Sequence, residues 1–158
     1  MNPGVAFATV SPSAARLTES LRDIGYDFSS AVADLIDNSV SAGAEKIRVH
    51  MEFDGENSRV LICDDGQGMS VNGAIEALRF GSRRDYELGD LGRYGLGLKT
   101  ASLSQGRSVT VVSRSTRMKE PQLQRLDLDV IAEHDDWIIM VPPADAATIR
   151  ARELLAGD

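Results

Sequence analysis

Three short blocks of residues have the types and the order that one nucleotide-binding site needs. They read Asp34-Leu-Ile-Asp-Asn38, Asp64-Asp-Gly66-Gln-Gly68 and Gly92-Arg-Tyr-Gly95-Leu-Gly97-Leu-Lys99. In turn they would supply an amide that binds a metal ion, a carboxylate that reads a base and a glycine-rich loop that holds phosphates. Each block alone is a weak signal, and their combination predicts an ATP site.

The first block lies on a predicted helix, where Asp34 and Asn38 are four residues apart and share one face. The side-chain oxygen of an asparagine suits Mg²⁺, which takes the rest of its shell from waters and phosphates. A carboxylate one turn earlier can orient or deprotonate the water that attacks a γ-phosphate. A solvated helix side explains most such pairs. An opposite apolar ridge of Val32, Ile36 and Val40 favours a site, because it would pack the helix on a sheet.

The second block follows an apolar strand. An Asp-Gly pair there ordinarily marks a strand-ending turn. Asp64 can instead accept a hydrogen bond from the amino group of adenine, while Gly66 and Gly68 let the ring approach the backbone. Such a carboxylate would select adenine over guanine, whose corresponding position is an acceptor. Met69 follows directly and completes the predicted base-binding set.

The third block precedes a predicted helix. Backbone amides at a helix start bind anions, and glycine permits a close approach to them. The spacing before Lys99 is not that of a Walker-type loop, and a flexible turn explains the block equally well when it is taken alone. The predicted phosphate-binding residues are Gly92, Gly95, Leu96, Gly97, Leu98, Lys99 and Thr100.

Hydrophobic periodicity and turn residues predict the elements that would position these blocks. We expect helices over residues 13–23, 28–42, 71–79, 96–103 and 145–155, and strands over 46–53, 59–63, 108–114, 123–129 and 137–141. Ser13 is the predicted cap of the first helix, and Ser29 or Ser30 that of the second. Strands in runs with helices between them predict an α+β sandwich, with a largely antiparallel sheet covered by helices on one face.

Length and composition narrow the class of protein. The 158 residues correspond to one domain, and the single cysteine, Cys63, lies in an apolar run and is predicted to fill the core rather than to react. Trp137 is likewise a predicted core aromatic. A net charge of −7 argues against a domain that wraps nucleic acid by bulk electrostatics. No apolar run approaches the length of a membrane span and no leader is visible, so we expect a cytoplasmic protein.

From about Leu21 to Gln105 the chain resembles the GHKL ATPases, which include gyrase B, a heat-shock chaperone, sensor histidine kinases and MutL. Residues 21–27, 33–39 and 92–102 are most similar to MORC-type ATPases and their bacterial relatives. The resemblance implies a Bergerat fold, a two-layer sandwich with a mostly antiparallel mixed sheet. It places ATP between helices and sheet, with Asn38 on Mg²⁺, Asp64 on adenine, and residues from about 70 to 97 as an ATP lid. We expect the 158 residues to form a single domain whose first 12 residues are a loose N-terminus.

Three departures from the family pattern matter. Asp34 stands where most hydrolytic members have glutamate, so its carboxylate is shorter by one methylene and slow hydrolysis is expected. Ser41 stands where many members have an acid. After Gln105 no Gly-Thr box occurs, and no second domain is present to supply the lysine that usually reaches the γ-phosphate. We therefore expect an N-terminal piece cut before the last strands of its sheet, or a reduced member.

These features leave more than one function open. The first is a slow Mg²⁺-ATPase that drives an ATP-dependent homodimer clamp, acting with an effector protein or DNA through other segments. The second is a module that binds ATP or ADP to control an interaction, without useful hydrolysis. A histidine kinase is disfavoured because the helix before the site has no phosphoacceptor histidine; His50 and His134 lie in or near predicted strands.

Overall fold

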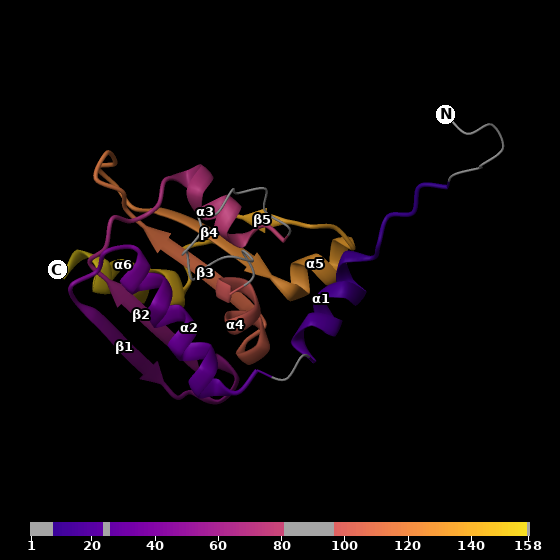
Figure 1. Ribbon diagram of the computed structural model, residues 1–158, viewed down its shortest axis with the longest axis horizontal. Coiled ribbons are helices and arrows are strands. Elements are labelled where there is room, and N and C mark those ends of the chain that lie inside the picture. Colours follow the sequence, from indigo (N-terminus) through magenta and orange to yellow (C-terminus); the bar gives the residue numbers. More distant parts are fainter. Residues whose placement is uncertain (1–7, 24–25, 81–96, 158) are drawn as a thin grey trace.

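A computed structural model describes residues 8–23, 26–80 and 97–157, and Figure 1 shows how their helices and strands are arranged. In chain order these are α1 (Ala14–Arg22), α2 (Phe28–Ser41), β1 (Ile47–Glu52), the 3₁₀ turn Gly55–Asn57, β2 (Arg59–Asp64), α3 (Val71–Leu78), α4 (Gly97–Gln105), β3 (Ser108–Ser113), β4 (Gln122–Asp127), α5 (Leu128–His134), β5 (Ile139–Met140) and α6 (Ala146–Ala156). The predicted α+β class is confirmed.

The strands form two antiparallel sheets. β1 and β2 make the predicted hairpin, with Val49 opposite Ile62, and the second sheet has the order β3-β4-β5, with Val109 opposite Leu126. Every strand pair in the described part of the chain is antiparallel. The backbone N–H of Met69, after β2, donates to Ser113 Oγ at the end of β3 over 2.7 Å, and this bond joins the two sheets.

The core lies on one face of the three-stranded sheet. Leu126 of β4 packs there with buried side chains from the helices around it, namely Ala14, Leu78, Leu103, Leu128 and Ile131. Successive residues of a strand point to opposite faces. Arg125 therefore points away from this core, and its guanidinium donates to Asp145, the cap of α6, over 2.7 Å. This bond lowers the pKa of Asp145 to about 2 and fixes α6 on the other face.

The caps of the first two helices differ in how well they were predicted. Ser13 caps α1 as expected, because its Oγ accepts a hydrogen bond from the N–H of Arg16. The predicted cap of α2, Ser29 or Ser30, is wrong: Asp27 caps this helix and accepts from Ser30 N over 3.0 Å. A carboxylate satisfies the free N–H groups of a first turn and also suits its partial positive charge. α2 therefore begins at Phe28, ahead of both serines.

The buried face of α2 also differs from the predicted ridge. Val40 is 55% exposed, whereas the buried residues of the helix are Ala31 and Ser39. α2 packs mainly against α4, which buries Ala101 at 0% exposure. Small side chains allow two helices to approach closely. Small residues of α2 therefore form the contact with α4, and larger apolar residues such as Val40 lie outside it.

The predicted strand 123–129 includes the first two residues of a helix, α5. The strand ends at Asp127, whose side chain accepts from Asp129 N and caps α5. Leu128 and Ile131 are three residues apart, so both point from α5 into the core. The predicted strand 137–141 shortens to Ile139–Met140. Trp137 is 39% exposed and lies against Phe80, with ring centroids 4.9 Å apart, so it borders the core instead of filling it.

Candidate nucleotide-binding site

α2 carries the first predicted block, and its two predicted site residues, Asp34 and Asn38, are both half-buried. The hydroxyl of Tyr26 donates a hydrogen bond to Oδ2 of Asp34, the predicted base. This bond raises the pKa of Tyr26 above its ordinary value, and burial adds to the shift. Asn38, the predicted magnesium ligand, lies one turn further along the same helix. The carboxylate of Asp34 is therefore held by a residue that comes before α2.

Asp64, the predicted adenine-reading residue, is held by two hydrogen bonds. Its Oδ2 accepts from Ser39 Oγ over 2.8 Å, and its Oδ1 accepts from the backbone N–H of Gly66 over 3.0 Å. An ionised carboxylate has about four acceptor positions, so roughly two remain for a ligand. Ser39 directly follows Asn38. The bond from Ser39 thus brings the first and second predicted blocks together.

Asp65, the other acid of the second block, has a different role. Its Oδ1 accepts hydrogen bonds from the backbone N–H groups of Glu45 and Lys46, over 2.8 and 2.9 Å. These bonds hold the pKa of Asp65 below its usual value. The carboxylate fixes the chain that enters β1. The ordinary explanation of an Asp-Gly turn therefore applies to Asp65, while Asp64 faces α2.

The glycines of the second block are required by close backbone packing. A Cβ on Gly66 would lie 2.9 Å from the carbonyl oxygen of Ala42. Gly68 has a φ of +67°, and a Cβ there would lie 2.3 Å from the carbonyl oxygen of Arg114. Both neighbours are backbone atoms. These two glycines let the loop after β2 pass between the end of α2 and the end of β3.

The third block is described only from Gly97 onward. Gly92, Gly95 and Leu96 lie outside the described residues, as does most of the predicted lid. Gly97 begins α4, Leu98 packs against the core, and Thr100 is half-buried.

Lys99, the predicted phosphate contact, is fully buried in this structure. Its Nζ donates to the carbonyl oxygen of Ala77 over 3.0 Å and lies 5.8 Å from the centre of the Phe80 ring. Burial lowers the pKa of Lys99, and the carboxylate of Glu76 acts in the opposite direction. The carbonyl end of α3 attracts a cation. The structure therefore places Lys99 at the end of α3, and a contact with phosphate stays a prediction.

The sequence was compared with models of known protein families, and one of them matches most of the chain. Residues 26–155 match the model of a family described as histidine kinase-, DNA gyrase B-, and HSP90-like ATPase. This chain belongs to that ATPase family. The match covers the elements from α2 to α6, including all the predicted site residues. The expected membership in the GHKL superfamily is confirmed.

Similar relatives of this ATPase-family domain carry MORC names. It is 31% identical to the human MORC family CW-type zinc finger protein 1 over 81% of this chain and 13% of that protein. It is 37% identical to ATPase morc-1 of Caenorhabditis elegans over 54% of this chain and 10% of that protein. Protein MICRORCHIDIA 5 of Arabidopsis thaliana is 36% identical over 54% of this chain and 13% of that protein. The chain thus matches only a small part of each relative's length.

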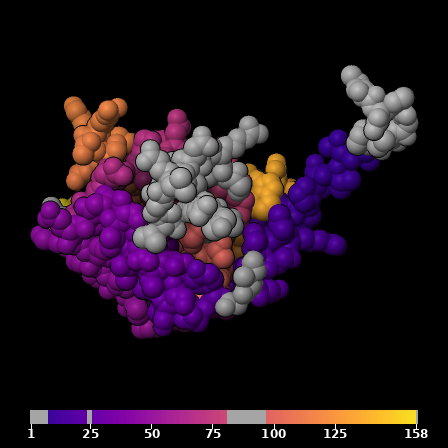
Figure 2. Space-filling view, in the orientation of Figure 1, coloured from indigo at the N-terminus to yellow at the C-terminus, as the bar shows by residue number. Residues whose placement is uncertain are grey.

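Figure 2 shows α4, in salmon, beside α2, in violet, on the face in view.

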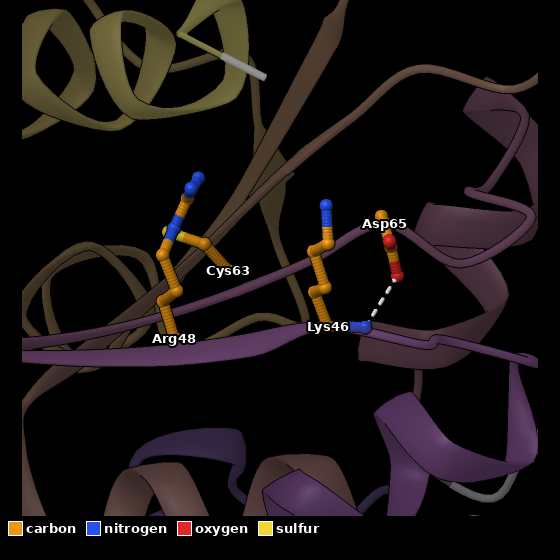
Figure 3. Close-up of a pocket in the computed structure, with 4 residues that line it drawn as sticks. All are labelled: Lys46, Arg48, Cys63 and Asp65. Carbon is orange, nitrogen blue, oxygen red and sulfur yellow. Dashed lines mark hydrogen bonds between the residues drawn. The ribbon is translucent and has the colours of Figure 1, made fainter.

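A separate cavity of about 260 Å³ is lined by Lys46, Arg48, Cys63 and Asp65. Figure 3 shows Lys46, just before β1, and Arg48 of β1 extending to the same side of the hairpin. Because Cys63 and Asp64 are neighbours on β2, they point to opposite faces. The cavity is therefore separate from the predicted nucleotide site. Cys63 is half-buried at its wall, so its prediction as a core residue is wrong.

Two further observations concern the described part of the ATPase-family domain. No group of three or more histidine, cysteine, aspartate or glutamate residues there could hold a metal ion. None of its helices has the length and apolarity needed to cross a membrane.

Sequence reasoning missed three residues that hold the site together: Tyr26, Ser39 and Ser113. Ser39 had a usable signal, because it lies next to Asn38 and eight residues after Ala31, where a helix returns to nearly the same face. Tyr26 lies in the stretch 21–27 that resembles MORC-type ATPases, but nothing in the sequence indicated its partner, and Ser113 had no signal. Their partners depend on how the first helices and the two sheets meet.

Gly97 gives a prediction about the phosphate loop. A Cβ there would meet no atom within 4 Å, so packing in the described structure does not require glycine. We expect Gly97→Ala to keep the free energy of unfolding or raise it by up to about 1 kcal/mol, because alanine favours a helix. The same change should weaken ATP binding by roughly tenfold if phosphate approaches this backbone. Urea unfolding and calorimetry measure the two effects. Gly106→Ala, at the other end of α4, is the control and should leave ATP affinity unchanged.

Proposed function

We propose that this domain binds Mg²⁺-ATP beside α2, the end of β2 and the start of α4, and hydrolyses it slowly. The observation that carries the proposal is the position of Asp64, which is held by Gly66 and by Ser39, the residue that follows Asn38 in α2. Membership in an ATPase family supports it independently.

The base would be read by Asp64. Its carboxylate has acceptor positions left after its two hydrogen bonds, and the amino group of adenine is a donor. Gly66, Gly68 and Met69 would line the ring. A guanine would present a carbonyl oxygen to the same carboxylate, and two acceptors repel. The site should therefore select ATP over GTP.

The magnesium ion would be held by Asn38 together with phosphate oxygens. Mg²⁺ takes few protein ligands when it travels with a nucleotide and keeps several waters. One amide oxygen therefore fits, although the described residues offer no carboxylate cluster. When bound, the ion would neutralise phosphate charge.

Asp34 would act as the general base. A water attacks the γ-phosphorus, its proton passes to the carboxylate, and the bond between the γ-phosphorus and the oxygen of ADP breaks. The negative charge would be met by Gly92, Gly95, Leu96, Gly97, Leu98, Lys99 and Thr100. A carboxylate that is one methylene shorter than that of glutamate agrees with slow turnover.

We propose that in a longer protein ATP closes a homodimer around a partner. The partner would be an effector protein or DNA, bound through other segments, because this domain carries a net charge of −7. The sequences of the relatives extend far beyond the matched part, which leaves room for such segments.

The second candidate function is ATP-controlled binding without useful hydrolysis. It is favoured by the placement of Lys99, whose ammonium group is engaged with the end of α3. In that case nucleotide binding alone would change the conformation that a partner recognises.

Calorimetric titration with Mg²⁺-ATP and Mg²⁺-GTP tests the site. We expect ATP to bind and GTP to give no signal. Asp64→Asn replaces an acceptor by a donor and should weaken ATP binding by roughly 10- to 150-fold, the usual cost of a lost charged hydrogen bond. Circular dichroism would show whether the variant is folded. Equal binding of ATP and GTP, or unchanged binding by a folded Asp64→Asn variant, would contradict the proposal.

A further inference from the structure

We infer that Tyr26 is a positioning residue for hydrolysis, which sets the carboxylate of Asp34 and connects it to α4. This inference rests on the proposed function, because it assumes that Asp34 is the base. The role would be distinct from nucleotide binding, which the proposed function assigns to other residues.

The contact between the two side chains is direct. The Tyr26 hydroxyl donates to Oδ2 of Asp34, and the same bond keeps the phenol protonated by raising its pKa. A hydrogen bond from the hydroxyl fixes the rotation of the carboxylate. One oxygen is then used for orientation, and the other oxygen can take the proton of a water.

Tyr26 is itself anchored on α4. Its carbonyl oxygen accepts a hydrogen bond from Gln105 Nε2 over 2.7 Å. A second bond joins the preceding helix to the same place, because Arg22 Nε donates to the carbonyl oxygen of Leu103 over 2.9 Å. Both the end of α1 and the start of α2 are thus tied to the last turn of α4, which packs along α2 (Figure 1).

The other end of α4 is the phosphate end. Gly97 begins the helix, and the predicted phosphate contacts from Gly97 to Thr100 lie in its first turn. A helix of nine residues transmits a displacement of its start to its end, because its backbone is rigid. The position of the carboxylate therefore depends on α4 through Gln105 and Tyr26. A base that is one methylene shorter than glutamate has less freedom to compensate for a displaced backbone, so the tyrosine matters more here.

Steady-state ATPase assays on the full chain, with ATP affinity measured in parallel, test this role. Tyr26→Phe removes the hydroxyl and keeps the ring. We expect kcat to fall by roughly 10- to 100-fold, as is usual for a misplaced catalytic group, and the Kd for ATP to stay within about threefold. Gln105→Met removes the anchor and should lower kcat in the same way by a smaller factor.

A double-mutant cycle separates positioning from a merely structural effect. Glutamate has the longer reach that most family members use, so Asp34→Glu should restore much of the rate lost in Tyr26→Phe. It should raise kcat less, or lower it, when Tyr26 is present. If Tyr26 only supports the fold, Asp34→Glu changes kcat by the same factor in both backgrounds, and that result overturns the inference.

The outcomes also distinguish the two proposals. A wild-type rate no higher than that of Asp34→Asn overturns both the hydrolysis proposal and the role of Tyr26. A wild-type rate well above it, with Tyr26→Phe within twofold of wild type, overturns only the role of Tyr26. Circular dichroism and ATP affinity show in each case that the variants are folded.

Discussion

Gly68→Ala is expected to lower the free energy of unfolding by about 3 kcal/mol or more, which is enough to unfold a marginally stable domain. Two costs combine. The residue has a φ of +67°, where an L side chain is strained, and its Cβ would lie 2.3 Å from the carbonyl oxygen of Arg114 and 2.8 Å from the carbonyl carbon. Both are backbone atoms of the segment after β3, so no side-chain rotation relieves the contact.

Gly43→Ala is the matched control for this prediction. Gly43 has a φ of +77°, close to that of Gly68, but a Cβ there would meet no atom within 4 Å. It should therefore lose only the strain of about 1–2 kcal/mol that the left-handed conformation imposes. Urea unfolding of the two variants measures the difference. Equal losses would show that the loop can move away from β3 without cost.

The same change should also reach the nucleotide site. Met69 follows Gly68 in the chain, and its backbone N–H donates to Ser113 Oγ at the end of β3. A displacement of this loop would therefore pull the predicted adenine-binding residues away from β3. Any Gly68→Ala protein that remains folded should therefore bind ATP more weakly. A folded variant with full ATP affinity would show that adenine does not bind at this loop.

Asp34→Asn is expected to lower ATP turnover by at least roughly 100-fold, since a general base contributes about 10²- to 10⁴-fold. Asparagine has nearly the same shape, and its amide oxygen can still accept from Tyr26, but it cannot take a proton from water. The Kd for ATP should stay within about threefold, because the contacts with adenine, the metal ion and the phosphates are assigned to other residues. Phosphate release and calorimetry measure the two quantities.

Asp37→Asn provides the matched control on the same helix. Asp37 is exposed, so neutralising it changes the charge of α2 by the same amount without touching the predicted base. Turnover should stay within twofold of wild type. If Asp34→Asn and Asp37→Asn reduced turnover equally, the effect would come from the charge of the helix. If wild type itself showed no turnover above Asp34→Asn, the domain would bind ATP without useful hydrolysis.

Local features were predictable from the residues alone. The cap at Ser13, the hairpin of β1 and β2 and the helices that follow Ser70 and Asp145 all depend on contacts between residues close in the chain. Nearby residues meet in every compact conformation, so their types and spacing are informative. The three blocks and the ATPase family were visible for a related reason, because chemistry demands particular residues in a particular order.

The errors arose where distant segments compete for the same residues. Leu126, Leu128 and Val130 alternate as in a strand, yet Leu128 and Ile131 both reach the core because α5 begins at Leu128. Cys63 lies in an apolar run, but the cavity beside Arg48 leaves it half-buried. Burial is a property of two surfaces that meet, and one segment does not reveal the surface of the other.

The sequence by itself determined which side chains carry the functional groups that nucleotide binding and hydrolysis require, because functional groups are properties of side chains. Tertiary structure alone decided how they are held. The bonds from Ser39 to Asp64 and from Tyr26 to Asp34, and the contact of Gly68 with the backbone of Arg114, appear only when helices and sheets meet. Such contacts form only when segments far apart in the chain are positioned to within a few tenths of an ångström, and residue order alone does not specify these positions.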